Sequence, residues 1–457
     1  MSIATVNPAN GKLVKKFSEL SEYELLSKIE NAEIAFRSWQ HTSFDYRKDK
    51  MLLAAKMLHD KKSEFGATLT LEMGKTISQA ISEVEKCALV CEYYANNAEN
   101  ILKEEIISTD ADKSYVRFDP LGVILAVMPW NFPFWQVFRF AAPALMAGNV
   151  ALLKHASNVP QCALLIEEIF HKAGFDKNVF QTLLIGSSAV DKVISHPFVK
   201  AATLTGSEPA GKNVAASCGK LLKKTVMELG GSDPFIVLDD ADLSAAISTG
   251  ITARLINNGQ SCIAAKRFIV QENIYEEFAK KFTLKMKNIK VGDPTKNETE
   301  LGPIAREDLL FDLLDQINRS VADGAKILCG GNRIPRDGFF LEPTILENVK
   351  GGMAAYHEEI FGPVAILIKA KSDDDAIRIA NDTDFGLGAS VWTSNKLRAE
   401  KFIKEIHAGS VFINGMVKSD PRLPFGGIKN SGYGRELSHY GIKEFVNIKT
   451  VWTKGLN

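Results

Sequence analysis

The chain has 457 residues, of which 46% are hydrophobic and 24% are charged, so it is long enough for two or three globular domains. Its 55 lysine and arginine residues equal its 55 aspartate and glutamate residues, which argues against nucleic acid or an acidic membrane surface as partner and favours a small molecule. The N-terminal residues lack the layout of a signal peptide, and no apolar run approaches the roughly 20 residues of a membrane helix, so we expect a cytoplasmic protein.

The first half of the chain predicts a helical region followed by a parallel sheet. Apolar residues at helical spacing indicate helices within 21–40 and 46–103. The segments 115–120 and 121–129 are extended, and the second has no polar alternation, which is typical of a strand buried on both faces. The elements expected next are strands at 150–154, 182–185 and 202–205, with a helix at 163–173. This alternation predicts a doubly wound α/β sheet.

A second α/β series begins near residue 232. Its expected strands are 235–238, 266–270, 340–345, 364–369, 389–392 and 410–413. Its expected helices are 243–257, 274–286, 306–323, 373–381 and 394–406. The closing segment 444–452 alternates apolar and polar residues, which predicts an edge strand that pairs in a sheet of this chain or of a partner subunit.

One cysteine is notable for its position in the chain. The segment Asn257-Asn258-Gly259-Gln260-Ser261-Cys262 places it after a glycine-led turn and before a small apolar run. The six cysteines form no Cys-x-x-Cys pair or Cys/His cluster, which predicts reduced thiols and no metal site. A free cysteine is most often a small core residue, and a thiol needs activation by its surroundings to act as a nucleophile. Cys262 is therefore a candidate nucleophile whose case depends on other residues.

The strand-to-helix junction at 203–212 is a candidate phosphate site. Ser207 follows Gly206 and suits the N-cap of a helix with Pro209 in its first turn, where free N–H groups bind phosphate well. Gly206 and Gly211 lie five residues apart, which is not the dinucleotide pattern G-x-G-x-x-G. On its own, the segment is more often an ordinary junction.

Two more residues follow buried strands and carry useful chemistry. Asn131 lies between Pro129 and Pro133, so its amide could donate one half of an oxyanion hole, although a rigid apolar turn is the alternative. Glu228 lies among apolar residues before a Gly-Gly turn, and such surroundings raise the pKa of a carboxyl toward the range of a general base. The alternative is a glutamate merely exposed at a strand end.

Taken together, these segments resemble the NAD(P)-dependent aldehyde dehydrogenases over nearly the whole chain. The ordered motifs are Trp130-Asn131-Phe132-Pro133, Thr205-Gly206-Ser207 with Gly211, Glu228-Leu229-Gly230-Gly231, Gly259-Gln260-Ser261-Cys262, Glu359-Ile360-Phe361-Gly362-Pro363 and Pro424-Phe425-Gly426-Gly427 with Ser431-Gly432. The resemblance implies an α/β fold of two doubly wound domains and a small β element, in a homodimer or homotetramer. It implies a cofactor-binding domain at 1–104 and 122–231, a catalytic domain at 232–423, and an oligomerisation element at 105–121 and 436–457.

The resemblance also implies a covalent route for oxidising an aldehyde. Cys262 attacks the aldehyde carbon to give a thiohemiacetal, whose oxyanion is held by the Asn131 amide and the Cys262 backbone N–H, at roughly 3–4 kcal/mol for each preorganised donor. Hydride transfer to the nicotinamide leaves a thioester. Glu228 then activates the water that hydrolyses this thioester and releases a carboxylic acid.

A set of cofactor-binding residues follows from the same resemblance. Trp130 and Ser207 are expected at the pyrophosphate, Lys154 at the adenine ribose, and Glu359 at the nicotinamide ribose with Phe361 packed nearby. The full expected set is Trp130, Lys154, Ser157, Gly206, Ser207, Gly211, Leu229, Glu359 and Phe361.

Ser157 bears on the choice between NAD and NADP. NAD-preferring members often carry glutamate at this position, where it accepts a hydrogen bond from the ribose 2′-OH. A serine does not repel a 2′-phosphate, and Lys154 can pair with that phosphate. We expect NADP to be accepted and preferred. If Ser157 only caps a helix before Pro160, NAD remains usable.

The substrate-binding residues are expected on a helix that follows Asn131. Trp135 and Arg139 are four apart and so share a face, and an arginine in an apolar segment needs an anion such as a substrate carboxylate. Arg139 and Ser419 resemble the carboxylate contacts of succinate-semialdehyde dehydrogenases. A snorkelling or internally paired arginine is the alternative. Members of that subgroup commonly carry a further arginine where this chain has Ile256, which leaves another ω-oxo acid, such as glutarate semialdehyde, open as the substrate.

Other functions share part of this residue set. A cysteine esterase or thioesterase would keep Cys262, Asn131 and Glu228 but would not need the nucleotide-binding segments. A phosphorylating or CoA-acylating dehydrogenase would not need Glu228 as hydrolytic base, and a purely structural protein would need neither the nucleophile nor the base.

Overall fold

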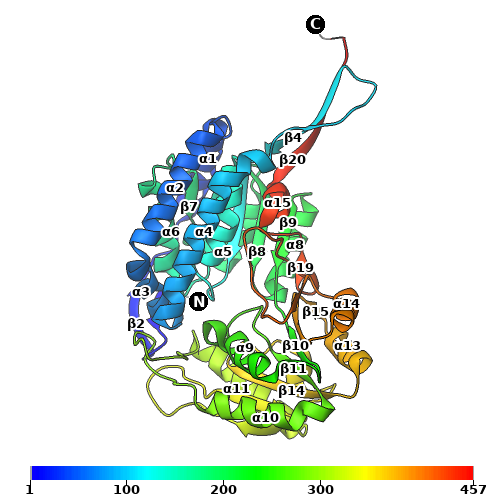
Figure 1. The fold of residues 1–457 in the computed structure, drawn as a ribbon. Coiled ribbons are helices and arrows are strands. Elements are labelled where there is room, and N and C mark those ends of the chain that lie inside the picture. Colours follow the sequence, from blue (N-terminus) through cyan, green and yellow to red (C-terminus); the bar gives the residue numbers. More distant parts are fainter. Residues whose placement is uncertain (1–2, 456–457) are drawn as a thin grey trace.

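Two α/β units and a projecting β-ribbon make up the fold, with the N-terminal unit in blue to green and the second unit in green to orange (Figure 1). The computed structural model describes residues 3–455. Within these residues, no helix is long and apolar enough to cross a membrane.

The first unit is built on a six-stranded sheet of order β19-β9-β8-β5-β6-β7. All neighbours in it are parallel except β19 and β9. The strands are β5 (Val123–Met128), β6 (Val150–His155), β7 (Phe180–Thr182), β8 (Val199–Thr205), β9 (Lys224–Glu228) and β19 (Gly432–Tyr433). Five of the six residues of the central strand β5 are buried, which confirms the prediction of a strand covered on both faces.

Helices cover this sheet on both sides, and the four N-terminal ones form the blue layer in Figure 1. They are α1 (Glu22–Trp39), α2 (Phe44–Asp60), α3 (Lys62–Met73), α4 (Ile77–Ile101), α5 (Trp135–Met146), α6 (Pro160–Lys172), α7 (Val190–Ser195), α8 (Glu208–Lys220) and α15 (Ser438–Ile442), with short 3-10 turns at Ser187–Ala189 and Lys443–Phe445. A hairpin of β1 (Ala4–Asn7) and β2 (Lys12–Lys16) precedes them.

The second unit contains a seven-stranded sheet of order β12-β13-β14-β11-β10-β16-β17. Its strands are β10 (Pro234–Val237), β11 (Arg267–Gln271), β12 (Lys326–Cys329), β13 (Thr344–Glu347), β14 (Val364–Ala370), β16 (Gly388–Trp392) and β17 (Ser410–Ile413). Its helices are α9 (Leu243–Leu255), α10 (Glu272–Lys287), α11 (Glu307–Ala322), α12 (Ala354–His357), α13 (Asp373–Asn381) and α14 (Lys396–Glu405). A small pair of β15 (Phe385–Gly386) and β18 (Ile428–Lys429) connects to it.

Alternation along β10 explains how this sheet is stabilised on both faces. Phe235 and Val237 belong to one buried cluster, whereas Ile236 and Leu238 belong to another. Successive side chains of a strand point to opposite faces, so the two clusters lie on opposite sides of the sheet. The second unit therefore has buried clusters of its own on both faces of its sheet.

The ribbon consists of β3 (Glu105–Ile106), β4 (Lys113–Pro120) and β20 (Val446–Thr453) in the order β20-β4-β3. The terminal strand thus pairs within its own chain, and its outer edge has no neighbour among the described residues. In Figure 1 the ribbon extends away from both units, and β20 runs along it toward its tip.

Two strands were predicted at the wrong residues, and a third strand was missed. The strand expected at 182–185 is Phe180–Thr182, because the Ile185 N–H bonds to the Leu183 carbonyl and the chain turns away from β6. The strand expected at 340–345 is Thr344–Glu347, because Pro343 lacks the N–H that a ladder needs. The strand β12 was missed altogether.

Candidate functional site

The loop that carries Cys262 follows a helix that ends earlier than predicted. The helix α9 stops at Leu255, and a 3-10 turn follows at Ile256–Gly259 in which Asn257 and Asn258 both have a φ of 57°. Asparagine tolerates this left-handed conformation better than most residues. The Asn257 side chain donates to the carbonyls of Asn131 (2.7 Å) and Gln260 (2.9 Å), so the turn is fixed to the segment that bears the oxyanion candidate.

Two buried cations, which the sequence analysis missed, hold the same loop from within. The Lys266 ammonium donates to the carbonyls of Ser261 (3.0 Å), Cys262 (2.8 Å) and Ala264 (3.3 Å). The Arg254 guanidinium donates to the Gly259 carbonyl at 2.6 Å. Both side chains are fully buried. The sequence does contain a signal for them, because each is a charged residue in an apolar segment next to the Cys262 motif.

Cys262 is the one cysteine of the six that is not classed as buried. Burial of the thiol nevertheless raises its pKa to about 12, against the opposing effect of the Lys266 and Arg139 charges. The expectation that neighbouring groups activate this thiol is therefore not met in the free protein. For Cys262 to act as a nucleophile, a base would have to remove its proton.

Glu228 is the carboxylate suited to that role. It ends β9 with only 2% of its surface exposed, and its Oε1 has no hydrogen-bond partner among the described residues. Burial, together with the charge of Glu436, raises its pKa to about 8. Glu228 does not line either of the two cavities described in the next paragraphs. Its negative charge nevertheless contributes to the raised pKa of Cys262. The alternative of an exposed glutamate at a strand end is excluded.

Asn131 is oriented by a network that leaves one donor available. Its Nδ2 donates to the Gln260 carbonyl at 3.1 Å, and its Oδ1 accepts from Gln136 Nε2 at 3.1 Å. An amide nitrogen carries two hydrogens, so the second can be directed toward an oxyanion. Asn131 and Cys262 line the same cavity.

That cavity, which we call the α8 cavity, has a volume of about 230 Å³ at the start of α8. The hydroxyl of Ser207, the N-cap residue, makes no capping hydrogen bond, so the first turn of α8 keeps free N–H donors for an anion. Trp130 and Phe361 face each other edge to face with ring centroids 5.7 Å apart. The predicted cofactor residues that line the cavity are Trp130, Gly206, Ser207, Leu229, Glu359 and Phe361.

Close approach explains two glycines beside this cavity. A Cβ on Gly230 would overlap the Glu359 carboxylate, and a Cβ on Gly211 would overlap the Leu229 side chain. Glu359 accepts from the Gly231 N–H at 2.9 Å and pairs with Lys266 at 3.5 Å. The residues present fit a dinucleotide, because they combine free helix N–H groups, an aromatic wall and a carboxylate that can accept from a ribose hydroxyl.

Lys154, Ser157 and Gly211 do not line the α8 cavity. Lys154 lies on β6 opposite Val127 of β5, so it is at the same carboxyl edge of the sheet as Trp130. Ser157 lies in the turn that follows β6, and the N-cap of α6 is Val159, so Ser157 does not cap that helix. The alternative role proposed for Ser157 from sequence is therefore wrong.

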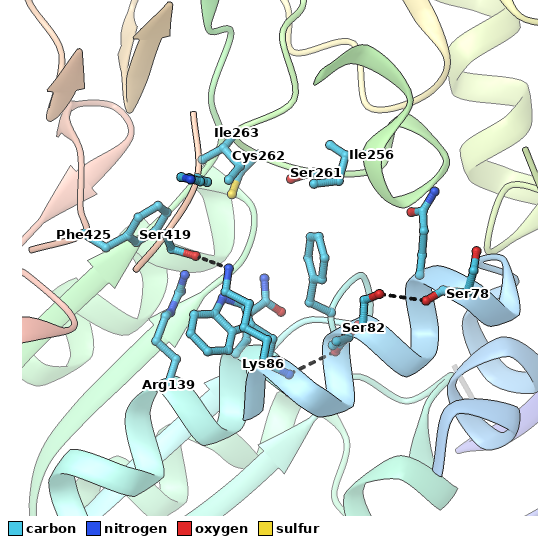
Figure 2. Close-up of a pocket in the computed structure, with 16 residues that line it drawn as sticks. Ser78, Ser82, Lys86, Arg139, Ile256, Ser261, Cys262, Ile263, Ser419 and Phe425 are labelled. Atoms are coloured by element: carbon cyan, nitrogen blue, oxygen red, sulfur yellow. Dashed lines mark hydrogen bonds between the residues drawn. The ribbon is translucent and has the colours of Figure 1, made fainter. Parts of the chain in front are cut away.

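A second cavity, the α4–α5 cavity, has a volume of about 290 Å³ and lies between those two helices and the Cys262 loop (Figure 2). This volume is near the lower end of small-molecule sites. The predicted substrate residues Trp135, Arg139 and Ser419 all line it, and so does Ile256. Lys86 also lines it and was missed, although Ser78, Ser82 and Lys86 at spacings of four residues indicate one helix face.

Arg139 is internally paired. Its Nε forms an ion pair with the Glu436 carboxylate, its Nη2 donates to Thr205 Oγ1 at 3.3 Å, and its guanidinium lies 4.7 Å from the Phe425 ring centroid. Only 3% of Arg139 is exposed. The structure thus realises the internal pairing that the sequence analysis left open, while keeping Arg139 on the cavity wall.

Cys262 and Gln136 line both cavities. A nucleophile at the junction of a cofactor-shaped site and a small-molecule site is the geometry that a two-substrate reaction needs. A family model described as the aldehyde dehydrogenase family matches residues 1–451. The chain belongs to the aldehyde dehydrogenase family. This finding confirms the resemblance deduced from the ordered motifs.

Individual members of the aldehyde dehydrogenase family are similar to this chain over its full length. A Synechocystis protein named probable succinate-semialdehyde dehydrogenase, with NADP(+) in its name, is 54% identical over 452 residues, covering 99% of this chain and 100% of that protein. The Mycobacterium tuberculosis succinate-semialdehyde dehydrogenase 1, also named with NADP(+), is 52% identical with the same coverage.

Solved structures of the family share the fold. The crystal structure of succinic semialdehyde dehydrogenase from Streptococcus pyogenes in complex with NADP+ has a TM-score of 0.97 at 38% identity, covering 99% of this chain and 100% of that one. An aldehyde dehydrogenase from Brucella melitensis has a TM-score of 0.96 at 33% identity, covering 100% of this chain and 95% of that one. The predicted fold class is confirmed.

Proposed function

We propose that this protein oxidises an aldehyde to a carboxylic acid with NADP, and that its substrate is succinate semialdehyde. The observation that carries the proposal is the position of Cys262 at the junction of the α4–α5 and α8 cavities. The names of the relatives from Synechocystis and Mycobacterium tuberculosis support both the substrate and the cofactor.

The chain supplies the groups for each step of this reaction. Glu228 accepts the Cys262 proton, the sulfur bonds to the aldehyde carbon, and the Asn131 amide and Cys262 N–H stabilise the oxyanion of the thiohemiacetal. NADP, held by the residues of the α8 cavity, would supply the hydride acceptor, and loss of hydride from the thiohemiacetal carbon would leave an acyl thioester on Cys262. Glu228 then releases the thiol proton to solvent and, once ionised again, takes a proton from water; the hydroxide attacks the acyl carbon, and the thiolate leaves.

NADP is supported as cofactor by what surrounds the expected 2′-phosphate. Lys154 supplies a cation at the carboxyl edge of β6, and burial lowers its pKa. Ser157 adds no negative charge and is not engaged as a helix cap. A phosphate at this place would therefore meet a cation without a matching carboxylate at position 157. We propose the set of cofactor residues given above, including Lys154, Ser157 and Gly211.

The α4–α5 cavity supports a small aldehyde with a carboxylate at its far end. It combines an aromatic and aliphatic wall with positively charged side chains opposite Cys262, as Figure 2 shows for Arg139 and Lys86. Ile256 on the wall supplies no charge, which favours keeping glutarate semialdehyde as the second candidate.

We also propose a cofactor-binding domain at 1–104 and 122–231, a catalytic domain at 232–423 and an oligomerisation element at 105–121 and 436–457, in a homodimer or homotetramer. The ribbon of β20, β4 and β3 extends from the body and exposes Ile448, Trp452 and Ile106. The strand β17 lies at the edge of the catalytic sheet, so a strand from a second copy could pair with it. Light scattering of the purified protein tests this assembly.

Steady-state kinetics with NAD and NADP tests the proposed function. The panel consists of succinate semialdehyde, glutarate semialdehyde and butanal, which differ in length and terminal charge. We expect the highest kcat/KM with NADP and succinate semialdehyde. Comparable kcat/KM for butanal would contradict the substrate class, and a higher kcat/KM with NAD would contradict the cofactor.

A further inference from the structure

The junction between α3 and α4, residues 72–83, is in contact with the loop that carries the nucleophile. The Gly74 carbonyl accepts a hydrogen bond from Asn258 Nδ2 at 2.9 Å. Gln79 Oε1 accepts the Asn257 N–H at 2.5 Å. Both asparagines belong to the left-handed turn that precedes the nucleophile. The junction is therefore fixed to this turn, and two buried carboxylates within it extend its contacts to other parts of the site.

Glu83, on α4, caps the first turn of α5. The first N–H groups of a helix have no partner within the helix, and the N-cap residue of α5, Phe134, makes no side-chain capping bond. Glu83 Oε1 accepts the N–H groups of Phe134 (2.9 Å) and Trp135 (3.0 Å). A negative charge is also favourable at this end of a helix. Glu83 thus supplies from α4 the cap that the sequence of α5 lacks.

Lys75 connects Glu83 to the turn that bears Asn131. Lys75 and Glu83 form an ion pair in which both side chains are buried. The Lys75 Nζ also lies 4.3 Å from the ring centroid of Phe132, the residue after Asn131. From the first turn of α5, Gln136 donates to Asn131 Oδ1 at 3.1 Å. The ion pair thus fixes both the residue that follows Asn131 and the helix start from which its amide is oriented.

Glu72, at the other end of the junction, caps α6 in the same way. The N-cap residue of α6, Val159, has no side-chain capping bond. The Glu72 carboxylate accepts the N–H groups of Gln161 at 3.0 Å and Cys162 at 2.9 Å. It also accepts the hydroxyl of Thr5 on β1. Glu72 is fully buried, so these bonds are protected from competition with water.

The start of α6 directly follows the turn that carries Ser157. The Ala4 N–H donates to the Ser157 carbonyl at 3.0 Å. The next residue, Thr5, accepts from Gln161 Nε2 at 3.0 Å while it donates to Glu72. Strand β1 and Glu72 therefore hold both the Ser157 turn and the helix start behind it.

We propose that Glu72 and Glu83 are positioning residues for two different parts of the reaction. Glu83, paired with Lys75, holds the Asn131 amide where the oxyanion develops, and Glu72 holds the Ser157 turn where the cofactor binds. Neither carboxylate acts on a reacting atom in this assignment. The inference rests on the proposed oxidation of an aldehyde with NADP.

The double substitution Lys75→Met/Glu83→Gln tests the first half, because it removes both charges and leaves no buried ion unpaired. We expect the rate of the NADPH burst to fall about tenfold for succinate semialdehyde and butanal alike, since a small misplacement of a donor weakens oxyanion stabilisation. The Kd for NADPH should stay at the wild-type value. In an Asn131→Ala background the same double substitution should have little further effect, because the donor that it positions is already gone.

Glu72→Gln is the matched variant for the second half. Among residues 3–455 no cation pairs with Glu72, so this substitution strands no buried charge, but its amide nitrogen cannot accept an N–H of α6. We expect the Kd for NADPH, measured by fluorescence titration without aldehyde, to rise about tenfold. The burst rate at saturating NADP should remain within about twofold of the wild type.

A merely structural role would lower the melting temperature of both variants without dividing the two readouts. The proposal is overturned if both variants change the same readout, if the NADPH Kd of Glu72→Gln is unchanged, or if the effect of Lys75→Met/Glu83→Gln adds in full to that of Asn131→Ala. Should a variant fail to fold, Glu72→Asp and Glu83→Asp keep the charge and should show the same division at smaller size. Wild-type protein that forms no NADPH with any aldehyde would overturn the proposed function, whereas the binding measurement on Glu72→Gln would still decide the cofactor half.

Discussion

The pH dependence of turnover tests the role of Glu228. Burial and the Glu436 charge raise the pKa of Glu228 to about 8. At pH 7, one unit lower, about a tenth of these carboxyls are ionised, whereas about nine-tenths are ionised near pH 9. Because only the ionised form accepts a proton from water, kcat limited by thioester hydrolysis should rise about tenfold over this range.

Two substitutions should change the pH dependence of kcat in defined directions. Glu228→Gln cannot accept a proton, so kcat should fall roughly 10²- to 10⁴-fold and lose its rise with pH. Glu436→Gln removes a negative neighbour and frees Arg139, and both changes lower the pKa of Glu228. The rising limb of kcat should then move to lower pH, and kcat at pH 7 should approach the value of the wild type at high pH.

Stopped-flow absorbance of NADPH separates the two half-reactions. A burst of NADPH followed by a slower steady rate indicates that thioester hydrolysis limits turnover. Burial raises the pKa of Cys262 to about 12, so a limb near pH 8 in the steady rate does not arise from the free thiol. The reasoning is refuted if a burst is present but the steady rate is independent of pH, or if Glu436→Gln leaves the limb in place.

Three further substitutions test the cofactor site and the nucleophile loop. Ser157→Glu should shift the ratio of kcat/KM from NADP toward NAD, and an unchanged ratio in cofactor titrations would contradict the role of position 157. Gly230→Ala should raise the Kd for NADPH about tenfold, because the added methyl would displace Glu359; fluorescence titration measures this, and an unaltered Kd would disprove it. Lys266→Met should lower the free energy of unfolding by about 3 kcal/mol, since the carbonyls around Cys262 lose their buried donor. Urea denaturation with an unchanged midpoint would rule that out.

Much of the fold was predictable because its signals are local. The apolar run that became β5 and the helical periodicity of α4 are properties of a few consecutive residues. The errors occurred where the bounds of an element depend on a long-range contact or on an unusual backbone conformation. The end of α9 depends on Asn257 and Asn258 adopting left-handed backbone angles, which the helical pattern of the segment does not reveal.

In the candidate site, too, residues in local motifs were predictable and long-range contacts were not. Motif order indicated Cys262, Asn131 and Glu228 because each has a fixed place after a strand or turn. The partners of Arg139 and Lys86 could not be predicted, because Glu436 and Ser419 are brought to α5 and α4 from the far end of the chain. Whether a buried cation is free or neutralised is decided by this tertiary placement and not by its neighbours in sequence.

The electrostatics of Cys262 and Glu228 impose a shared role on one carboxylate. Burial raises the pKa of Cys262 to about 12, so very little of the thiol is ionised at pH 7 unless a base takes its proton. Glu228 has an unpartnered Oε1 and a pKa of about 8, so roughly a tenth of molecules contain a base ready to take that proton. In the proposed mechanism the thiol proton passes to solvent once the acyl group is attached, and the same Oε1 then accepts a proton from water. If Glu228 serves both steps as proposed, thiol activation and thioester hydrolysis are coupled through one titration, and the charges of Glu436 and Arg139 shift the pH at which it occurs.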